Sequence, residues 1–80
     1  MKVLISNLDK IHTTPGGITR IRKNLNLDSN VDIIEFCKNI IKDPNSLIYK
    51  NGKNYYCNND NIILTINSYN FCIITAHFAK

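Results

Sequence analysis

Two histidines are the residues of this chain best suited to acid–base chemistry, because histidine alone titrates near neutral pH without perturbation. His12 precedes two threonine hydroxyls, and His77 follows Thr75 by two positions near the end of the chain. Histidines with nearby arginines supply a base, an acid and cations for RNA cleavage without a metal. His12 and His77 are therefore the catalytic candidates. A lone histidine more often bonds a backbone carbonyl or is only hydrated, so a structural role stays open for each.

Cations, hydroxyl groups and aromatic rings accompany the histidines. The candidate substrate-binding residues are Thr13, Thr14, Arg20, Arg22, Lys23, Tyr56 and Thr75. Residues 1–23 carry five cations and one acid, whereas residues 24–48 carry two cations and four acids. Phosphates bind Lys and Arg, and unstacked bases bind aromatic rings, so we expect a small surface that binds RNA or a nucleotide. A net charge of +4 on 80 residues also keeps a small domain in solution, and the sequence does not separate these two interpretations.

Helices and strands must position these side chains. Apolar residues at helical spacing predict helices over residues 2–11, 15–25 and 31–42. Thr14 and Pro15 suit the start of the second helix. Beyond Pro44 the apolar period falls to two, and Asn51-Gly52 indicates a hairpin turn. The predicted strands span residues 46–50, 53–57, 61–67 and 71–78. The expected fold class is α+β, with the helices packed on a four-stranded antiparallel meander in a single domain.

The last hairpin permits a prediction of which residues share a sheet face. If Asn67 lies opposite Phe71, one face is uniformly apolar and packs against the helices. Its opposed pairs are Ile66 with Cys72, Leu64 with Ile74, and Ile62 with Ala76. The other face is mixed and carries Asn61, Ile63, Thr65, Asn67, Phe71, Ile73, Thr75 and His77. We expect this mixed face to meet solvent or a ligand.

Composition narrows the class of protein further. No apolar run approaches the roughly 18 residues that a membrane span needs, and Asn7 and Asp9 interrupt any signal-peptide core. We therefore expect a cytoplasmic protein with no membrane partner. Cys37, Cys57 and Cys72 have no zinc-ligand spacing and resemble small buried apolar residues. We expect no metal and no cofactor.

Several short segments together carry a resemblance to a known family. They are Lys10-Ile11-His12-Thr13-Thr14, Gly17, Arg20-Ile21, Asn24-Leu25, Gly52-Lys53-Asn54-Tyr55-Tyr56, Thr65-Ile66-Asn67 and Ile73-Ile74-Thr75-Ala76-His77. In this order and spacing they resemble a bacterial family of small stand-alone proteins of unknown function. The resemblance covers nearly the whole chain and implies no activity.

The order of elements also resembles, more distantly, the barnase–EndoU–colicin–RelE superfamily, which includes toxins of the RelE and BrnT types. This resemblance implies a metal-independent endoribonuclease with cationic, His and Tyr residues on the exposed sheet face. Those toxins often carry a His and an Arg one helical turn apart in the first helix. Here Gly16 stands four residues before Arg20, and the nearest histidine is His12.

Two alternatives to an RNA-binding or RNA-cleaving protein follow from the sequence. The first is a non-catalytic phage or mobile-element anti-defence protein that binds a host nuclease complex or sequesters a nucleotide signal. Thirteen Asn, fourteen Ile and eight Lys, all with A/T-rich codons, indicate a low-GC genome or one of its mobile elements. The second is a subunit that pairs with a protein, such as an antitoxin or a host defence protein, through an exposed edge strand at 46–50 or 71–78.

Overall fold

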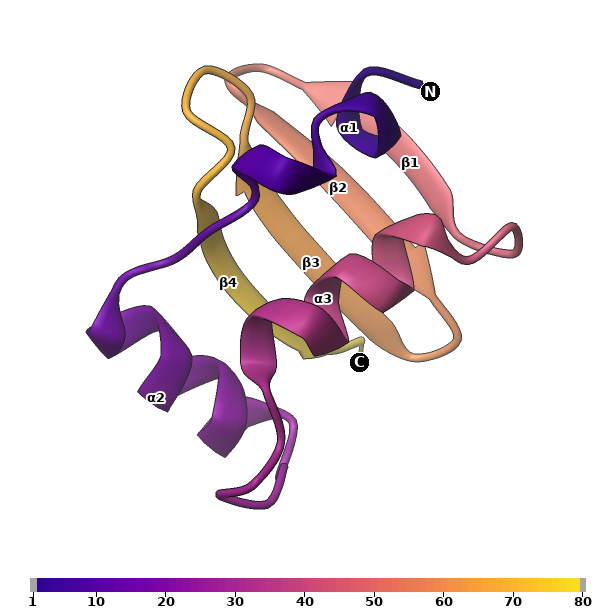
Figure 1. Ribbon diagram of the computed structural model, residues 1–80. Coiled ribbons are helices and arrows are strands. Elements are labelled where there is room, and N and C mark those ends of the chain that lie inside the picture. Colours follow the sequence, from indigo (N-terminus) through magenta and orange to yellow (C-terminus); the bar gives the residue numbers. More distant parts are fainter. Residues whose placement is uncertain (1, 80) are drawn as a thin grey trace.

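The helices and the sheet form separate layers in the computed structural model, which describes residues 2–79 (Figure 1). The helical elements are α1 (Lys2–Ser6), the 3-10 turn η1 (Leu8–Lys10), α2 (Pro15–Asn24) and α3 (Ile33–Lys42). The strands are β1 (Leu47–Asn51), β2 (Asn54–Asn59), β3 (Ile62–Asn67) and β4 (Ile73–Phe78). They form one antiparallel sheet in the order β1-β2-β3-β4. The predicted α+β class is confirmed.

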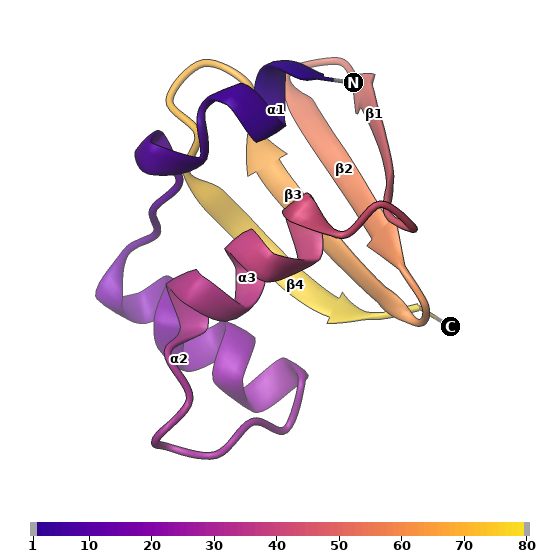
Figure 2. The same cartoon turned by 45° about the vertical axis from the view of Figure 1, so that its right-hand side comes forward.

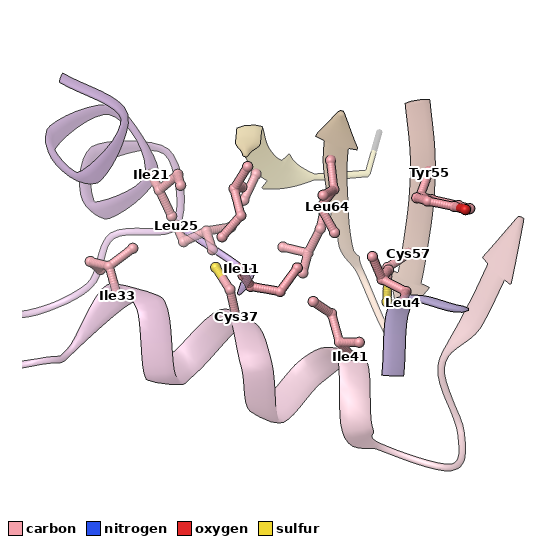
Figure 3. Packing of buried hydrophobic residues seen from close by; sticks show 13 residues of the cluster. Leu4, Ile11, Ile21, Leu25, Ile33, Cys37, Ile41, Tyr55, Cys57 and Leu64 are labelled. Atoms are coloured by element: carbon pink, nitrogen blue, oxygen red, sulfur yellow. The ribbon is translucent and has the colours of Figure 1, made fainter. Parts of the chain in front are cut away.

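One face of the sheet is covered by helices. α1 and α3 lie across this face, and α2 lies beside β4 (Figures 1 and 2). The core fills the space between the layers, and α3 directs Cys37 and Ile41 toward the sheet (Figure 3). The buried apolar residues are Leu4, Ile11, Ile21, Leu25, Ile33, Cys37, Ile41, Tyr55, Cys57, Leu64, Ile66, Ile73 and Ala76. Within residues 2–79, no helix lies on the opposite face, and none is long and apolar enough to cross a membrane.

Side-chain caps fix where α2 and α3 begin. Thr14 Oγ1 accepts a hydrogen bond from Gly17 N at 3.0 Å, as expected for the N-cap of α2. Asp32 caps α3, because its Oδ1 accepts from Glu35 N at 3.1 Å. α3 therefore begins at Ile33 rather than at residue 31.

The predicted helix over residues 2–11 is interrupted. α1 ends at Ser6, and η1 follows after Asn7. The Asn7 side chain donates to Val3 O at 2.7 Å, and its own carbonyl accepts from Lys10 N at 2.9 Å. An asparagine that bonds the backbone locally competes with the regular helical ladder, which explains the break.

The first hairpin turn lies one residue later than predicted. Asn51 pairs with Asn54, so Gly52 and Lys53 form the two-residue loop. Gly52 has φ +64°, and positive φ at the first loop position alone matches a type II′ turn, in which glycine takes that position. The Asn51-Gly52 turn predicted from the sequence is therefore wrong in register, and this shift sets Tyr49 opposite Tyr56.

The last hairpin also differs from the prediction. Leu64 pairs with Ala76 instead of Ile74, and β4 begins at Ile73 instead of residue 71. A bulge opposite Thr65 and Ile66 inserts one extra residue into β4 and exchanges the faces of its first two residues. Ile73, expected on the mixed face, is buried, whereas Ile74, expected in the core, is 40% exposed. Cys72, also expected on the core face, is only half-buried.

Candidate nucleic-acid interface

The helix-free face of the sheet, hereafter the outer face, carries three rows of side chains that run across the strands. Alternation along each strand assigns these residues to the face opposite the core. The first row is Leu47, Asn58, Ile63 and His77; the second is Tyr49, Tyr56, Thr65 and Thr75; the third is Asn51, Asn54 and Asn67. Despite the register error, Ile63, Thr65, Thr75 and His77 share this face as the sequence predicts.

Two tyrosines form the aromatic part of the outer face. The rings of Tyr49 and Tyr56 are stacked with centroids 5.4 Å apart and an interplanar angle of 23°. Tyr49 lies on the edge strand β1 and is 47% exposed. Tyr56 pairs across the sheet with Thr65, which pairs in turn with Thr75. The row thus presents an accessible ring at one edge and the half-buried hydroxyl of Thr75 toward the other, with Thr65 buried between them.

Both histidine rings bond a backbone carbonyl through Nδ1. His12 Nδ1 lies 2.9 Å from Lys10 O, and His77 Nδ1 lies 3.0 Å from Phe78 O. A carbonyl oxygen can only accept, so Nδ1 carries the proton and, in the neutral ring, Nε2 is the free acceptor. Both side chains are exposed. Each histidine thus makes the carbonyl contact that a structural role requires and still keeps one nitrogen available.

The two histidines lie far apart along β4. The backbone of His12 pairs with Cys72, which precedes His77 by five residues. At about 3.3 Å per residue, this separates the two positions by roughly 16 Å. An acid and a base that act on one phosphate must each approach the reacting oxygens to within about 3 Å. The structure therefore does not bring His12 and His77 to one phosphate; His77 shares the outer face with Thr75, and His12 does not.

The segment that contains the other N-terminal candidates covers the free edge of β4. Ile73 N donates to His12 O at 2.7 Å, and Thr13 Oγ1 donates to Ile73 O at 2.8 Å. Further along the edge, Asn24 Nδ2 donates to Ala76 O at 3.2 Å, and Arg20 Nη1 donates to Ile74 O at 3.5 Å. Thr13 therefore holds the edge of the sheet, and Thr14 caps α2. Of the two edges expected to be exposed, only the one at β1 is free of such a cover within residues 2–79.

The cations of α2 divide into two kinds. Arg22 Nη1 donates to Asp28 O at 2.6 Å and Val31 O at 3.0 Å, so this guanidinium ties the α2–α3 connection to the helix. Arg20 and Lys23 are exposed on α2 beside β4. Lys23 can therefore reach a phosphate at that edge of the sheet, and Arg20 can do so with the guanidinium nitrogens that do not contact Ile74 O. Arg22 is held by two short bonds to backbone carbonyls.

Sequence reasoning overlooked two residues of the outer face. Tyr49 was not among the candidate residues, and Thr65 was assigned to the face without a role. Placing Gly52 at the first loop position of a type II′ turn would have paired Tyr49 with Tyr56. Within residues 2–79, no three His, Cys, Asp or Glu side chains meet as metal ligands, and no pocket indents the surface.

Comparison with known proteins returns a family without an assigned function. The sequence pattern of the family described as "Protein of unknown function (DUF3781)" matches residues 5–77. No curated protein and no solved structure matches the chain. The match confirms the resemblance to a small family of unknown function and does not extend to the RNase-toxin superfamily.

Proposed function

Because the chain belongs to the DUF3781 family, whose description assigns no activity, we propose its function from the outer face and the cations beside β4: it binds single-stranded RNA there. The observation that carries this proposal is the stacked Tyr49–Tyr56 pair on a helix-free antiparallel sheet, in the same row as the half-buried hydroxyl group of Thr75. Cytoplasmic RNA is the partner that such a face suits.

The physical basis is the complementarity between this face and unpaired nucleotides. Four-stranded sheets with exposed aromatic side chains provide flat platforms on which bases stack, and hydroxyl and amide groups bond base edges and the 2′-OH. In the third row of the outer face, Asn51 and Asn54 add amide groups that can donate and accept. A paired helix would hide its bases from the tyrosines, so single strands are the favoured ligand.

The exposed cations beside β4 supply the phosphate contacts. For single strands, the logarithm of the association constant falls by about 0.7 per phosphate contact for each tenfold increase in salt. Contacts from Arg20 and Lys23 therefore predict a slope of about −1.4. Removing one of them in Lys23→Gln should reduce the magnitude of the slope by about 0.7.

Fluorescence anisotropy with labelled single-stranded RNA tests the proposal directly. Tyr49→Leu and Tyr56→Leu remove a ring and should each weaken binding about 5- to 150-fold, the usual range for loss of one stacked base. Tyr49→Phe keeps the ring and should bind like the wild type. Tyr55→Phe changes a tyrosine on the buried face and should also leave binding unchanged. No measurable affinity of the wild-type protein for any single-stranded RNA would overturn the proposal.

Cleavage is the weaker form of the proposal, because the distance between His12 and His77 favours binding over a two-histidine mechanism. Incubation of RNA with a high concentration of protein and no metal should leave the RNA intact. A product with a 2′,3′-cyclic end, lost in His77→Ala, would instead support a ribonuclease of the RelE or BrnT type. A protein that binds no RNA but co-purifies from its host with a nuclease complex would support the anti-defence alternative.

A further inference from the structure

The loop that joins β3 to β4 holds the most exposed large apolar or aromatic side chain among the described residues. Tyr69, at its tip, is 77% exposed, whereas Phe71 packs against the core. A single exposed tyrosine is ordinary on a protein surface. The hydrogen bonds and charges around this loop distinguish Tyr69 from such a case.

Hydrogen bonds from side chains fix the shape of the loop. Asn67 Oδ1 accepts from Tyr69 N at 2.8 Å and from Asn70 N at 3.1 Å. Asn70 Oδ1 accepts from Cys72 N at 2.9 Å. Tyr69 therefore stands on a backbone that is already ordered, and a base that stacks on its ring would not have to order the loop first.

The same loop contains a strained residue. Phe71 has φ +60°, a conformation that costs an aromatic residue energy and persists only where the surroundings impose it. Here the surroundings are the buried side of the Phe71 ring and the bond from His12 N to Phe71 O. The strain turns Phe71 inward, and its neighbour Tyr69 remains in water. Such strain is often found where a loop binds a ligand.

Cations lie next to this loop at the same end of the sheet. Ser68 N donates to Lys53 O at 2.8 Å, which joins the loop to the β1–β2 turn and its exposed lysine. Lys10 Nζ lies 6.0 Å from the centroid of the Phe71 ring. An accessible ring in a loop whose residues Ser68 and Phe71 contact two lysines has the composition of a nucleotide-binding position on a single strand.

We propose that Tyr69 is a second base-stacking position, at which single-stranded RNA bound to the outer face continues past the end of the sheet toward Lys53. This inference rests on the proposed function. Asn67 connects the two positions, because it ends the third row of the outer face and anchors the loop. Thr65, the cross-strand partner of Tyr56, precedes Asn67 by two residues, and Asn67 precedes Tyr69 by two more. Tyr56 and Tyr69 are therefore separated by roughly 13 Å along the strand direction. At about 3.4 Å between successive stacked nucleotides, a stacked strand of five or more nucleotides is needed to reach both.

Oligoadenylates of three and eight nucleotides test the inference, with affinities measured by titration of the isotope-labelled full-length protein in NMR. Tyr69→Ala should weaken binding of the eight-nucleotide strand about 5- to 150-fold and leave the three-nucleotide strand unaffected. Tyr56→Leu should weaken both. Tyr69→Phe, which keeps the ring, should bind both strands like the wild type.

The possible failures are distinguishable. If the wild-type protein binds no single-stranded RNA, these two strands included, the proposed function and the inference both fail. If the wild-type protein binds and Tyr69→Ala binds the longer strand equally well, only the inference fails. Equal weakening of both strands would also overturn the inference, because Tyr69 would then contact the three-nucleotide strand as well and would not be a second position reached only by longer RNA. Thermal unfolding of Tyr69→Ala, expected near the wild-type midpoint because the side chain is exposed, excludes loss of fold as a cause.

Discussion

Arg22 and Lys23 are adjacent in α2, yet their side chains have different surroundings. Arg22 satisfies the carbonyls of Asp28 and Val31, whereas Lys23 is exposed. Hydrogen bonds from a charged donor contribute about 1.5–3 kcal/mol, so Arg22→Gln should lower the free energy of unfolding by roughly this amount. It should leave the affinity for RNA within twofold of wild type.

Lys23→Gln is the matched variant, because it removes a cation from the neighbouring position. Its free energy of unfolding should stay within about 0.5 kcal/mol of wild type, as for most surface substitutions. Urea denaturation compares the two variants. Equal destabilisation of both would show that Arg22 does not hold the α2–α3 connection.

The three cysteines should differ in reactivity. Burial, with Cys57 as a smaller cause, raises the pKa of Cys37 to about 12. Burial is also the main cause that raises the pKa of Cys57. Because the thiolate is the nucleophile, iodoacetamide at pH 8 should label only the half-buried Cys72 in the native protein, and all three after unfolding. Mass spectrometry counts the labels; rapid native labelling of Cys37 would contradict the packing of α3 on the sheet.

At the scale of elements, the contact between α2 and the edge of β4 depends on the absence of a side chain at Gly17. A Cβ at this position would meet Thr13 Oγ1, the atom that donates to Ile73 O. Gly17→Ala should therefore displace Thr13 and lower the free energy of unfolding by about 1–3 kcal/mol, the usual cost of overpacking.

Gly16→Ala provides the control in the same helical turn. Its nearest neighbour would be Thr14 Oγ1 at 3.9 Å, an ordinary contact. Alanine is the better helix former, so Gly16→Ala should be neutral or stabilise the protein by up to about 1 kcal/mol. Urea denaturation measures both variants, and a Gly17→Ala protein as stable as Gly16→Ala would show that the edge contact tolerates rearrangement.

Local patterns predicted the type and order of the elements but not the register between strands. Apolar spacing was sufficient to predict α2 and α3, and the Thr14 cap was sufficient for the start of α2, because these signals lie within a few residues of one another. Register depends on turn conformation. A Gly52–Lys53 loop sets Tyr49 opposite Tyr56, whereas an Asn51–Gly52 loop would set Tyr49 opposite Asn54. The bulge in β4 likewise follows a loop in which Phe71 has a positive φ. The spacing of apolar residues along the sequence does not predict such a backbone angle.

The candidate site was accessible to sequence reasoning where it depends on alternation within one strand. Thr75 and His77 share the outer face because they are two residues apart, and neither the register nor the bulge changes that relation. The role of Arg22 was not accessible, because its acceptors are backbone carbonyls and every residue has one. The same holds for Thr13 at the edge of β4.

At the scale of the whole molecule, the turn from α3 into β1 joins both layers and should respond to acid. Asp43 Oδ1 accepts from Asn45 N at 2.9 Å, and Asn59 of β2 donates to Ser46 Oγ at 2.8 Å. The backbone bond from Asn45, with a smaller contribution from Asn59, lowers the pKa of Asp43 below its ordinary value. The carboxylate therefore stabilises the fold above its ordinary pKa, and this stability is lost as the pH falls through the lowered pKa.

Asp43→Asn should reveal this contribution. The variant should be less stable than wild type at pH 7. The difference should begin to shrink near the ordinary carboxyl pKa of about 4 and close as the pH falls through the lowered pKa of Asp43, where the wild-type carboxyl also becomes neutral. Thermal midpoints measured between pH 2 and pH 7 give the comparison. A difference that stays constant over this range would contradict the assignment of the acid sensitivity to Asp43.

The unequal edges of the sheet limit how copies of this protein can assemble. The segment from His12 to Asn24 occupies the edge of β4, so a strand that joins the sheet can add only beside β1. Two copies that pair through β1 about a twofold axis use up the free edge of each. Backbone pairing through the sheet therefore ends at a dimer and cannot extend into a fibre.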